Sequence, residues 1–537
     1  MKRIAQIRMT KKQIFLLILA FILFNFLLSV GFSLLAVKNL KRNNLFLAAQ
    51  HSKKAVIFPK ITNALTFNLM ADVKVWQISL ETIIKVNQVK TAADDYSQTV
   101  FLTDAANFEK SSLVLDSINS LSQNIEKLNQ ANQKSLIAKK YLEPSLLENI
   151  SILSADGQKL AEHFLTGKHR YIIVLQNSQE IRATGGFMGS FARLHLNHGQ
   201  IEDLIIEDIY EPTGQFTGFV EAPPGVKEYL SGGQGMRLPD SNWHPDFPSS
   251  AQQILHYFAL GKQQSIEGVF AINLDLLEDI LKITGPLYLA DSKVTINKNN
   301  LAELARENRK DFFPGSQEKT NFLAEAFNQI KFKLSDLNEE QKIQLVQLLI
   351  DSLENKNIQL YSNHSTTQDI FEKYNLAGEL KKQPDKITLM LVESNVGINK
   401  ANKGIEREIL IKTDDQVVTI DVNFSNNNKK PTIVENTNPY YKETQHLAYI
   451  NYQRVITDPD VTVKRIALNN QDITNFNEDI IINSKGEEFK QIGFLITLAE
   501  QKKGNLTVEL KLGENYDAKT KIFVQKQAGL DTNAIKK

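Results

Sequence analysis

The sequence predicts a membrane-anchored protein of several domains: an N-terminal transmembrane helix, a helical bundle or stalk, an α/β domain with a mixed sheet, and a C-terminal antiparallel β-sandwich. Three observations predict this order. An uncharged apolar run lies near the N-terminus, a stretch with helical periodicity and little glycine follows it, and beyond residue 390 the pattern is of strands alone. A chain of 537 residues is too long for one hydrophobic core, so it is expected to divide into domains.

Residues 1–37 predict one membrane anchor. The run 14–37 carries no charged side chain, and at about 1.5 Å per residue it can cross a hydrocarbon core of ~30 Å. The alternative is a cleavable signal peptide, whose apolar region is usually about 7–15 residues long. The basic tail 1–13 places the N-terminus in the cytoplasm and the bulk of the chain outside it, although basic residues also follow the run. The tail carries Lys2, Arg3, Arg8, Lys11 and Lys12, and after the run come Lys38, Lys41 and Arg42.

Residues 40–165 predict helices that form a stalk or bundle. Apolar residues recur at intervals of three and four, and glycine is nearly absent before Gly157. Pro59 and Pro144 are natural breaks between helices. We interpret the apolar stripes as core faces rather than ligand sites. One such stripe comprises Leu113, Ile118, Leu121, Ile125 and Leu128.

Residues 166–390 alternate short strands with amphipathic helices, which predicts an α/β domain around a mixed sheet. The strand candidates are 171–175, 191–196, 201–206 and 268–272, and the helix candidates are 248–260, 274–284, 301–308, 318–334 and 338–354. From 391 to 525 apolar and polar residues alternate between polar turns, as in an antiparallel sandwich of immunoglobulin-like size. We expect the tail 526–537 to be disordered.

The composition excludes several classes of function. The 62 basic and 61 acidic residues give a formal net charge of +1, which argues against a nucleic-acid partner because such binding needs a basic surface. The chain has no cysteine, so disulfides, thiolate metal sites and cysteine nucleophiles are excluded. No nucleophile elbow and no HExxH motif occurs.

A glycine-rich segment, residues 180–190, lies between two strand candidates and contains Arg182, Gly185 and Gly186. Glycine permits positive φ and close approach of the backbone, and arginine offers a planar fork of donors for phosphate or carboxylate. The segment is neither a Walker A loop nor a dinucleotide fingerprint. Two interpretations remain open: an anion pocket, or a tight turn whose arginine faces water.

A second segment, residues 237–251, combines Asp240, Asn242, His244 and Asp246 with three prolines and a tryptophan. A stiff loop that ends at a helix N-terminus can present carboxylates and backbone N–H groups together. Asp240 and Asp246 can hold a hard divalent cation through oxygen ligands. The alternative is that these aspartates make Asx turns and cap the helix.

A third group of charges consists of Arg306, Arg309 and Lys310, followed by Lys319. Their pattern is typical of a solvated turn between two helices. Acid pairs are numerous in the chain, so Glu207 and Asp208 alone do not indicate a glycosidase.

Several long motifs resemble the bacterial family known as domain of unknown function 4012, over residues 165–460. They include Arg182-Ala-Thr-Gly-Gly-Phe-Met-Gly-Ser, Ser241-Asn-Trp-His-Pro-Asp-Phe-Pro-Ser-Ser-Ala, Glu267-Gly-Val-Phe-Ala-Ile-Asn, Thr284-Gly-Pro and Glu393-Ser-Asn-Val-Gly-Ile-Asn-Lys-Ala-Asn. The order of elements is also distantly similar to the LytR–CpsA–Psr family. Those proteins are single-span, outward-facing enzymes that transfer glycan polymers from polyprenyl-pyrophosphate carriers to cell-envelope acceptors.

The second resemblance implies a site. Arg182, Arg306, Arg309 and Lys319 would bind a diphosphate, and Asp208, with Asp240 or Asp246, would hold a divalent cation such as Mg²⁺ that offsets leaving-group charge. Arg182 and Asp208 would then be the catalytic pair. The chain departs from that family at three places: Thr184 replaces an aspartate, Glu207 replaces an arginine, and Lys319 stands alone where two arginines are expected. Fewer arginines would hold a diphosphate less tightly.

Two functions follow from these expectations. The first is an extracytoplasmic, glycopolymer-transferase-like protein that binds or transfers polyprenyl-pyrophosphate-linked glycan to an envelope polymer. The second is a non-catalytic envelope protein that binds glycan or a partner, with the helical stalk as a spacer. The missing acid and arginine positions favour the second function, and the matched position of Arg182 favours the first.

Overall fold

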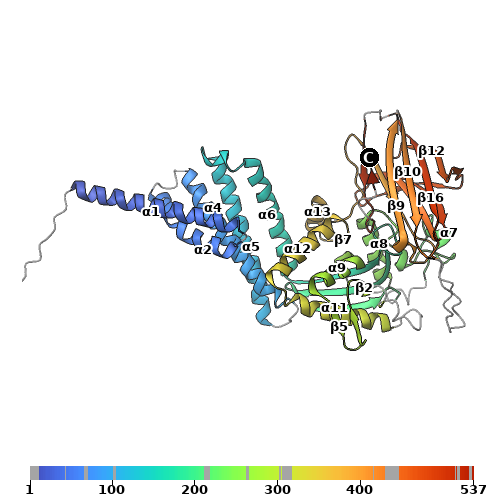
Figure 1. Cartoon of the computed structure of the whole chain (residues 1–537), viewed down its shortest axis with the longest axis horizontal. Coiled ribbons are helices and arrows are strands. Elements are labelled where there is room, and N and C mark those ends of the chain that lie inside the picture. The colour runs from blue at the N-terminus through green and yellow to red at the C-terminus, as the bar shows by residue number, and fades with distance from the viewer. Residues whose placement is uncertain are drawn as a thin grey trace, which may run out of the picture. The chain divides into compact units, whose positions relative to one another are not determined.

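The structure is a computed structural model (Figure 1). It describes residues 11–42, 44–65, 71–100, 105–210, 218–261, 265–301, 304, 317–414, 416–429, 447–514, 516, 520–530 and 535–536. The chain divides into two compact units. The first unit comprises the chain up to Lys168 together with Leu196–Glu202, and the second comprises His169–His195 and everything from Asp203 onward.

The first unit is helical, as predicted. Buried apolar residues of α4, α5 and α6 form its core, among them Ile78, Leu128 and Leu147. Asn44 caps α2 through its side chain, which accepts a hydrogen bond from the Leu47 N–H. The helices are α1 (Lys11–Leu40), α2 (Leu45–Ala55), α3 (Ile57–Leu65), α4 (Ala71–Ser97), α5 (Ala105–Gln133), the 3₁₀ turn η1 (Ala138–Lys140) and α6 (Pro144–Leu165).

The run that the sequence predicts as a transmembrane segment lies within α1. Among the residues that the structure describes, no helix combines the length and the hydropathy that a membrane crossing requires.

The second unit begins with a five-stranded sheet in the order β3-β2-β1-β4-β7. β1 runs parallel to β4, with Gln176 opposite Asn273, and β4 runs antiparallel to β7. The predicted mixed sheet is therefore confirmed. The strands are β1 (Lys168–Asn177), β2 (Phe187–Asn197), β3 (Gln200–Asp208), β4 (Gly268–Asn273) and β7 (Ile358–Ser362), and a separate hairpin consists of β5 (Leu287–Leu289) and β6 (Val294–Ile296).

Helices cover both faces of this sheet, because alternate residues of each strand point to opposite sides. On one face Ile172 and Val174 pack with α8, and on the other face Leu175 and Ile272 pack with α9, α11 and α12. The bounds of the helices are α7 (Val226–Tyr229), η3 (Leu238–Asp240), α8 (Phe247–Leu260), α9 (Leu274–Thr284), α11 (Gln317–Leu334), α12 (Glu339–Glu354) and α13 (Ser365–Lys373).

The C-terminal half of the second unit is a β-sandwich of two sheets, in the orders β13-β12-β16-β10-β9-β18 and β14-β15-β11-β8-β17. A single apolar core, which includes Val422, Val455 and Leu506, fills the space between the sheets. The elements are β8 (Lys386–Val392), η4 (Ala401–Gly404), β9 (Ile405–Asp414), β10 (Val417–Asn426), β11 (Tyr449–Thr457), β12 (Thr462–Leu468), β13 (Gln471–Asp472), β14 (Asn477–Ile482), β15 (Glu488–Leu498), β16 (Lys503–Lys511), β17 (Lys521–Gln525) and β18 (Ile535–Lys536).

The sandwich differs from the prediction in two respects. Its first strand, β8, begins at Lys386, and two of its pairings are parallel: β17 with β8 and β18 with β9. Residues 526–530, which the sequence predicts as part of a disordered tail, make specific contacts: the side-chain amide of Gln527 donates to the carbonyl oxygens of Arg182 and Glu393. The remaining pairings of the two sheets are antiparallel, as predicted.

Candidate functional site

The chemistry-bearing motifs gather at one edge of the mixed sheet. β1 and β4 are parallel and end at Asn177 and Asn273. The connections from β1 to β2 and from β2 to β3 are too short for a parallel crossover, so β2 begins and β3 ends at this same edge. β7 begins there as well, because Ile358 lies opposite Ile272. The carboxyl edge of parallel strands is where α/β sheets usually bind ligands.

The glycine-rich segment forms a tight connection across this edge. Gly185 has a φ of 129°, and a Cβ built on it would lie 2.7 Å from Oδ1 of Asn273. A Cβ on Gly186 would lie 2.3 Å from the carbonyl carbon of Asn177. Both positions therefore require glycine, because other groups approach the backbone too closely to leave room for a Cβ. The sequence left open an anion pocket or a tight turn, and the backbone of the segment forms a tight turn.

Arg182 in this turn is buried, and its side chain is 2% exposed. Its Nη1 donates to the carbonyl oxygen of Asn395 at 2.5 Å, and its Nη2 donates to Oε1 of Glu180 at 3.1 Å. Its Nε lies 3.7 Å from Oδ1 of Asp240. The guanidinium thus joins the α/β domain to the sandwich and faces two carboxylates, which is neither the water-facing arginine nor the open anion pocket that the sequence suggested.

The carboxyl groups of Glu180 and Asp240, which lie beside Arg182, are buried away from solvent. Burial raises the pKa of Glu180 and of Asp240, and the Arg182 guanidinium opposes this rise in both. Any phosphate entering here would meet two acids and a guanidinium that is already hydrogen-bonded, so the local charge does not favour an added anion.

Next to Arg182 lies a buried cluster of polar side chains from four segments. Asn242 donates to the Gly186 carbonyl oxygen at 2.8 Å, and Thr184 donates from Oγ1 to Oε1 of Gln176 at 2.6 Å. Gln359 and Gln176 both donate to the Thr184 carbonyl oxygen, at 2.6 Å and 3.0 Å. The Thr184 side chain therefore takes part in a buried network of neutral polar side chains.

The loop 237–251 holds α8 and the sandwich together. The Asp246 carboxylate caps α8 by accepting from the Ser249 N–H at 3.0 Å, and it also accepts from the N–H groups of Leu380 at 2.8 Å and Ser484 at 3.0 Å. His244 accepts from the Asp246 N–H through Nδ1 at 3.0 Å, and burial lowers the pKa of its imidazole. The capping interpretation of Asp246 is therefore the one that the contacts support.

The predicted metal ligands are not brought together. Asp208 ends β3, is buried, and accepts from the Tyr210 N–H through Oδ1 at 3.0 Å. Within the described ranges, none of Asp208, Asp240 and Asp246 belongs to a group of three His, Asp or Glu side chains near enough to share a metal ion.

The structure does not describe the side chains of the other cationic residues that were predicted to bind diphosphate. Arg306 and Arg309 lie outside the described residues. Lys319 lies in the first turn of α11, where only the helical backbone is described. Of the four residues predicted to bind diphosphate, Arg182 is the one whose side chain the structure describes.

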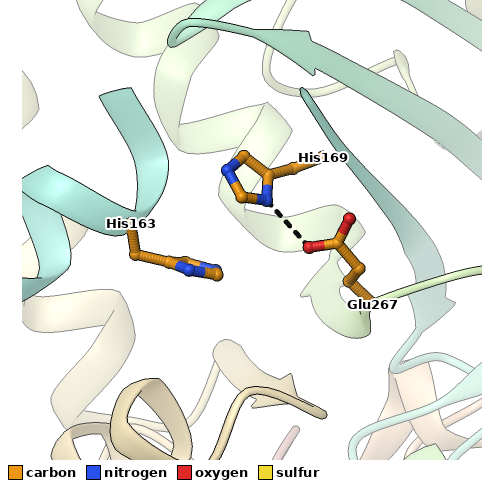
Figure 2. A group of neighbouring side chains, drawn as sticks. All are labelled: His163, His169 and Glu267. Carbon is orange, nitrogen blue, oxygen red and sulfur yellow. Dashed lines mark hydrogen bonds and ion pairs between the residues drawn. The ribbon is translucent and has the colours of Figure 1, made fainter. Parts of the chain in front are cut away.

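Sequence reasoning missed two groups at this edge. Arg454 on β11 is fully buried and donates to the Trp243 carbonyl oxygen, and its one signal is a charged residue in an otherwise uncharged strand. Lys356, between α12 and β7, gives no motif at all. At the opposite end of the sheet Nδ1 of His169 lies 2.8 Å from Oε2 of Glu267, within hydrogen-bonding distance (Figure 2).

The fold and the site together define a class: a three-layer α/β domain fused through a buried polar seam to a β-sandwich. Residues 166–309 match the model of the family described as "Protein of unknown function (DUF4012)", so the predicted resemblance to that family is confirmed over this part of the chain. None of the curated proteins matches the chain.

Proposed function

We propose that the protein is a non-catalytic binding protein of the bacterial cell envelope, in which the α/β domain and the sandwich act as one rigid body that holds a glycan-containing polymer. The main support for the proposal is the set of contacts that the Arg182 side chain makes. Its guanidinium is used by Glu180, Asp240 and the Asn395 carbonyl oxygen. A catalytic diphosphate clamp needs its arginine free to meet substrate, whereas a rigid binding body needs its domains locked together.

Localisation is part of the proposal. The basic tail and the apolar run 14–37 support a single-pass anchor with the bulk of the chain outside the cytoplasm. Exposed Leu27 and Leu34 on α1 are consistent with contact to lipid. Retention in the membrane after alkaline carbonate extraction, with loss of the two folded units to protease added outside intact cells, is the expected result. Release by carbonate would contradict the anchor.

The decisive experiment separates binding from transfer. Full-length protein in detergent is mixed with a synthetic polyprenyl-pyrophosphate glycan and with isolated envelope polymer. We expect the polymer to co-sediment with the protein and no polyprenyl phosphate to be released. Release of polyprenyl phosphate by the wild-type protein, together with loss of this release in Asp208→Asn, would overturn the proposal. That substitution keeps the Oδ1 acceptor used by the Tyr210 N–H, so it tests chemistry rather than folding.

The transferase-like function remains a second candidate because of one observation. The order of strands brings Asp208, at the end of β3, to the same sheet edge as the turn that contains Arg182. Transfer of glycan to an envelope acceptor would then need Arg182 to leave its present partners and a Mg²⁺ site to be completed by residues beyond Asp208. Stimulation of polymer transfer by Mg²⁺, absent in Arg182→Lys, would favour this candidate.

A further inference from the structure

The turn between α5 and α6, residues 134–142, holds apolar side chains in the solvent. Leu136 is 72% exposed, Ile137 is 61% exposed and Tyr141 is 83% exposed. The charged residues of the turn are all basic and, among the described residues, form no ion pair: Lys134, Lys139 and Lys140. Apolar residues scattered singly over a surface need no explanation, but three of them beside three lysines in one short turn form a patch with a definite chemistry.

The turn is fixed in this orientation from its inner side. The Asp72 carboxylate, at the start of α4, accepts from the N–H groups of Ile137 and Ala138 through Oδ1, at 2.9 Å each. The side-chain amide of Asn132 donates to the Leu142 carbonyl oxygen at 2.9 Å. Ala138 and Leu142 also pack against the apolar core of the first unit. Because these contacts hold the inner side of the turn, the apolar side chains on its outer side cannot turn inward to escape water.

The turn 134–142 lies at the end of the helical unit where α4 begins and α3 ends. It is bound to Asp72, the second residue of α4. In α3, Asn63 donates from Nδ2 to Oε1 of Gln77 at 2.6 Å. Lys60, which comes earlier in α3, pairs with Glu81, which comes later in α4, at 3.1 Å. The two helices are therefore antiparallel, and the last turn of α3 lies beside the first turn of α4.

The apolar run of α1 leaves the unit at this same end. The rings of Phe26 and of Phe58, near the start of α3, have their centres 5.4 Å apart. The Ser29 hydroxyl donates to the carbonyl oxygen of Ala55, the last residue of α2. Later residues of α2 and α3 thus meet earlier residues of α1, and the part of α1 before Phe26 projects beyond the other helices (Figure 1). The turn 134–142 therefore lies where the proposed membrane segment emerges.

We propose that this end of the helical unit docks on the bilayer surface, with Leu136, Ile137 and Tyr141 in the headgroup layer and the three lysines on anionic lipid phosphates. Tyrosine and aliphatic side chains are stable at this depth, and lysine stems cover apolar surface while their ammonium groups reach the headgroups. Ile57 and Ile61, which are 55% and 50% exposed, add apolar surface on the neighbouring α3. The inference rests on the membrane anchor of the proposed function, which brings this end of the unit to the bilayer.

The charge of the turn favours lipid over a second copy of the chain. Two such turns placed together would bring lysines against lysines, and this like charge disfavours self-association through the patch. An anionic leaflet instead attracts basic residues that lie within a Debye length of its surface, about 8–10 Å. Since the lysines share one short turn with the apolar side chains, both kinds of contact can form at the same depth.

The test uses the full-length protein reconstituted into vesicles of phosphatidylcholine and the anionic lipid phosphatidylglycerol. Because the chain has no cysteine, Ile137→Cys carries a single polarity-sensitive dye. The matched control is Leu113→Cys, which is 54% exposed and lies roughly 30 Å before the end of α5 at about 1.5 Å per residue. We expect the dye in Ile137→Cys to show blue-shifted emission and to be quenched by lipids with a shallow spin label. The dye in Leu113→Cys should show neither effect.

Two further variants, each made together with Ile137→Cys, separate the apolar and the basic contributions. Leu136→Gln with Tyr141→Gln removes apolar surface, and Lys134→Gln with Lys139→Gln and Lys140→Gln removes the charge. Each set should weaken the quenching, and high salt or vesicles of phosphatidylcholine alone should weaken it when the lysines are present. All these side chains are exposed, so the variants should fold, and thermal unfolding checks this.

Three outcomes would count against the docking surface. Absence of lipid quenching in Ile137→Cys overturns it. Blue-shifted emission without lipid quenching means that protein covers the turn, and overturns it as well. Quenching that is unchanged in either set of variants overturns the role assigned to the residues of that set.

Carbonate extraction of the same vesicles separates the docking surface from the anchor. If the protein stays in the membrane and the dye in Ile137→Cys is not quenched by lipid, the anchor stands and the docking surface fails. If carbonate releases a protein whose dye was quenched before extraction, the anchor fails and the docking surface stands.

Discussion

The guanidinium of Arg454 lies 4.4 Å from the centre of the Trp243 ring and donates from Nη1 to the Trp243 carbonyl oxygen at 2.9 Å. Arg454 belongs to β11 of the sandwich, and Trp243 belongs to the loop before α8. The same guanidinium donates to Oγ of Ser394 at 3.0 Å and to Oε1 of Gln491 at 3.2 Å. One buried side chain thus couples the two domains through three acceptors and an aromatic face.

Replacing Arg454 by methionine should destabilise the second unit. The loss of its hydrogen bonds and its ring contact is expected to lower the free energy of unfolding by about 3 kcal/mol. Urea unfolding followed by tryptophan fluorescence measures this. The control is Arg465→Met, because Arg465 is 39% exposed and pairs with an exposed Asp472, so its loss should cost less than about 1 kcal/mol. Equal stability of the two variants would contradict the coupling role.

A second prediction concerns Arg182. In Arg182→Met the carboxyl groups of Glu180 and Asp240 lose their counter-charge, and breaking a buried pair in this way typically costs about 3–5 kcal/mol of unfolding free energy. Adding Glu180→Gln should restore part of the loss, because one uncompensated acid is removed. Chemical denaturation of the single and double variants measures both effects. An Arg182→Met protein as stable as the wild type would show that Arg182 has no structural role.

The stability of the protein should fall at mildly acidic pH through His244. Burial lowers the pKa of His244 below its ordinary 6.5, Arg454 adds to this and Asp246 opposes it. The unfolded chain therefore takes up a proton below pH 6.5 that the folded chain does not bind, so this stability is complete above pH 6.5 and is lost as the pH falls towards the folded pKa.

The variant His244→Asn tests this pH dependence. It removes the titratable imidazole, while the asparagine amide oxygen can still accept a hydrogen bond from the Asp246 N–H in place of Nδ1. Unfolding free energies between pH 5 and 7.5 should depend less on pH in His244→Asn than in the wild type. His256→Asn, at an exposed position of α8, should leave the wild-type dependence unchanged. A His244→Asn protein with the wild-type pH profile would exclude His244 as its cause.

Two glycines should respond oppositely to alanine. A Cβ on Gly186 would overlap the main chain at Asn177, whereas a Cβ on Gly157, inside α6, meets nothing within 4 Å. Gly186→Ala should destabilise the second unit by about 2 kcal/mol or more, because the turn must shift. Gly157→Ala should stabilise its helix by about 0.5–1 kcal/mol. Calorimetric unfolding of each variant checks the signs, and a stabilising Gly186→Ala would contradict the packing described.

Local pattern was enough to predict much of the fold. Helical periodicity predicted the first unit, alternation predicted the strands, and capping chemistry was among the alternatives for Asp246, which the structure shows at the N-cap of α8. The parallel β17 and β18 were missed because strand direction depends on partners far along the chain. The setting of Arg182 could not be inferred for the same reason, since Asn395, which covers its guanidinium, lies 213 residues later. Lys356 gave no signal because its environment comes from three distant segments.

Gln527 fixes the order in which the second unit can be completed during synthesis. Its side-chain amide satisfies the carbonyl oxygen of Arg182, 345 residues earlier. Until the ribosome has delivered Gln527, the Arg182 carbonyl oxygen has the Gly185 N–H as a donor but lacks its second hydrogen bond, and β8 lacks its parallel neighbour β17. A nascent chain that stalls before this point therefore leaves the α/β domain open at the edge where the sandwich should close it, a form suited to capture by a chaperone or protease.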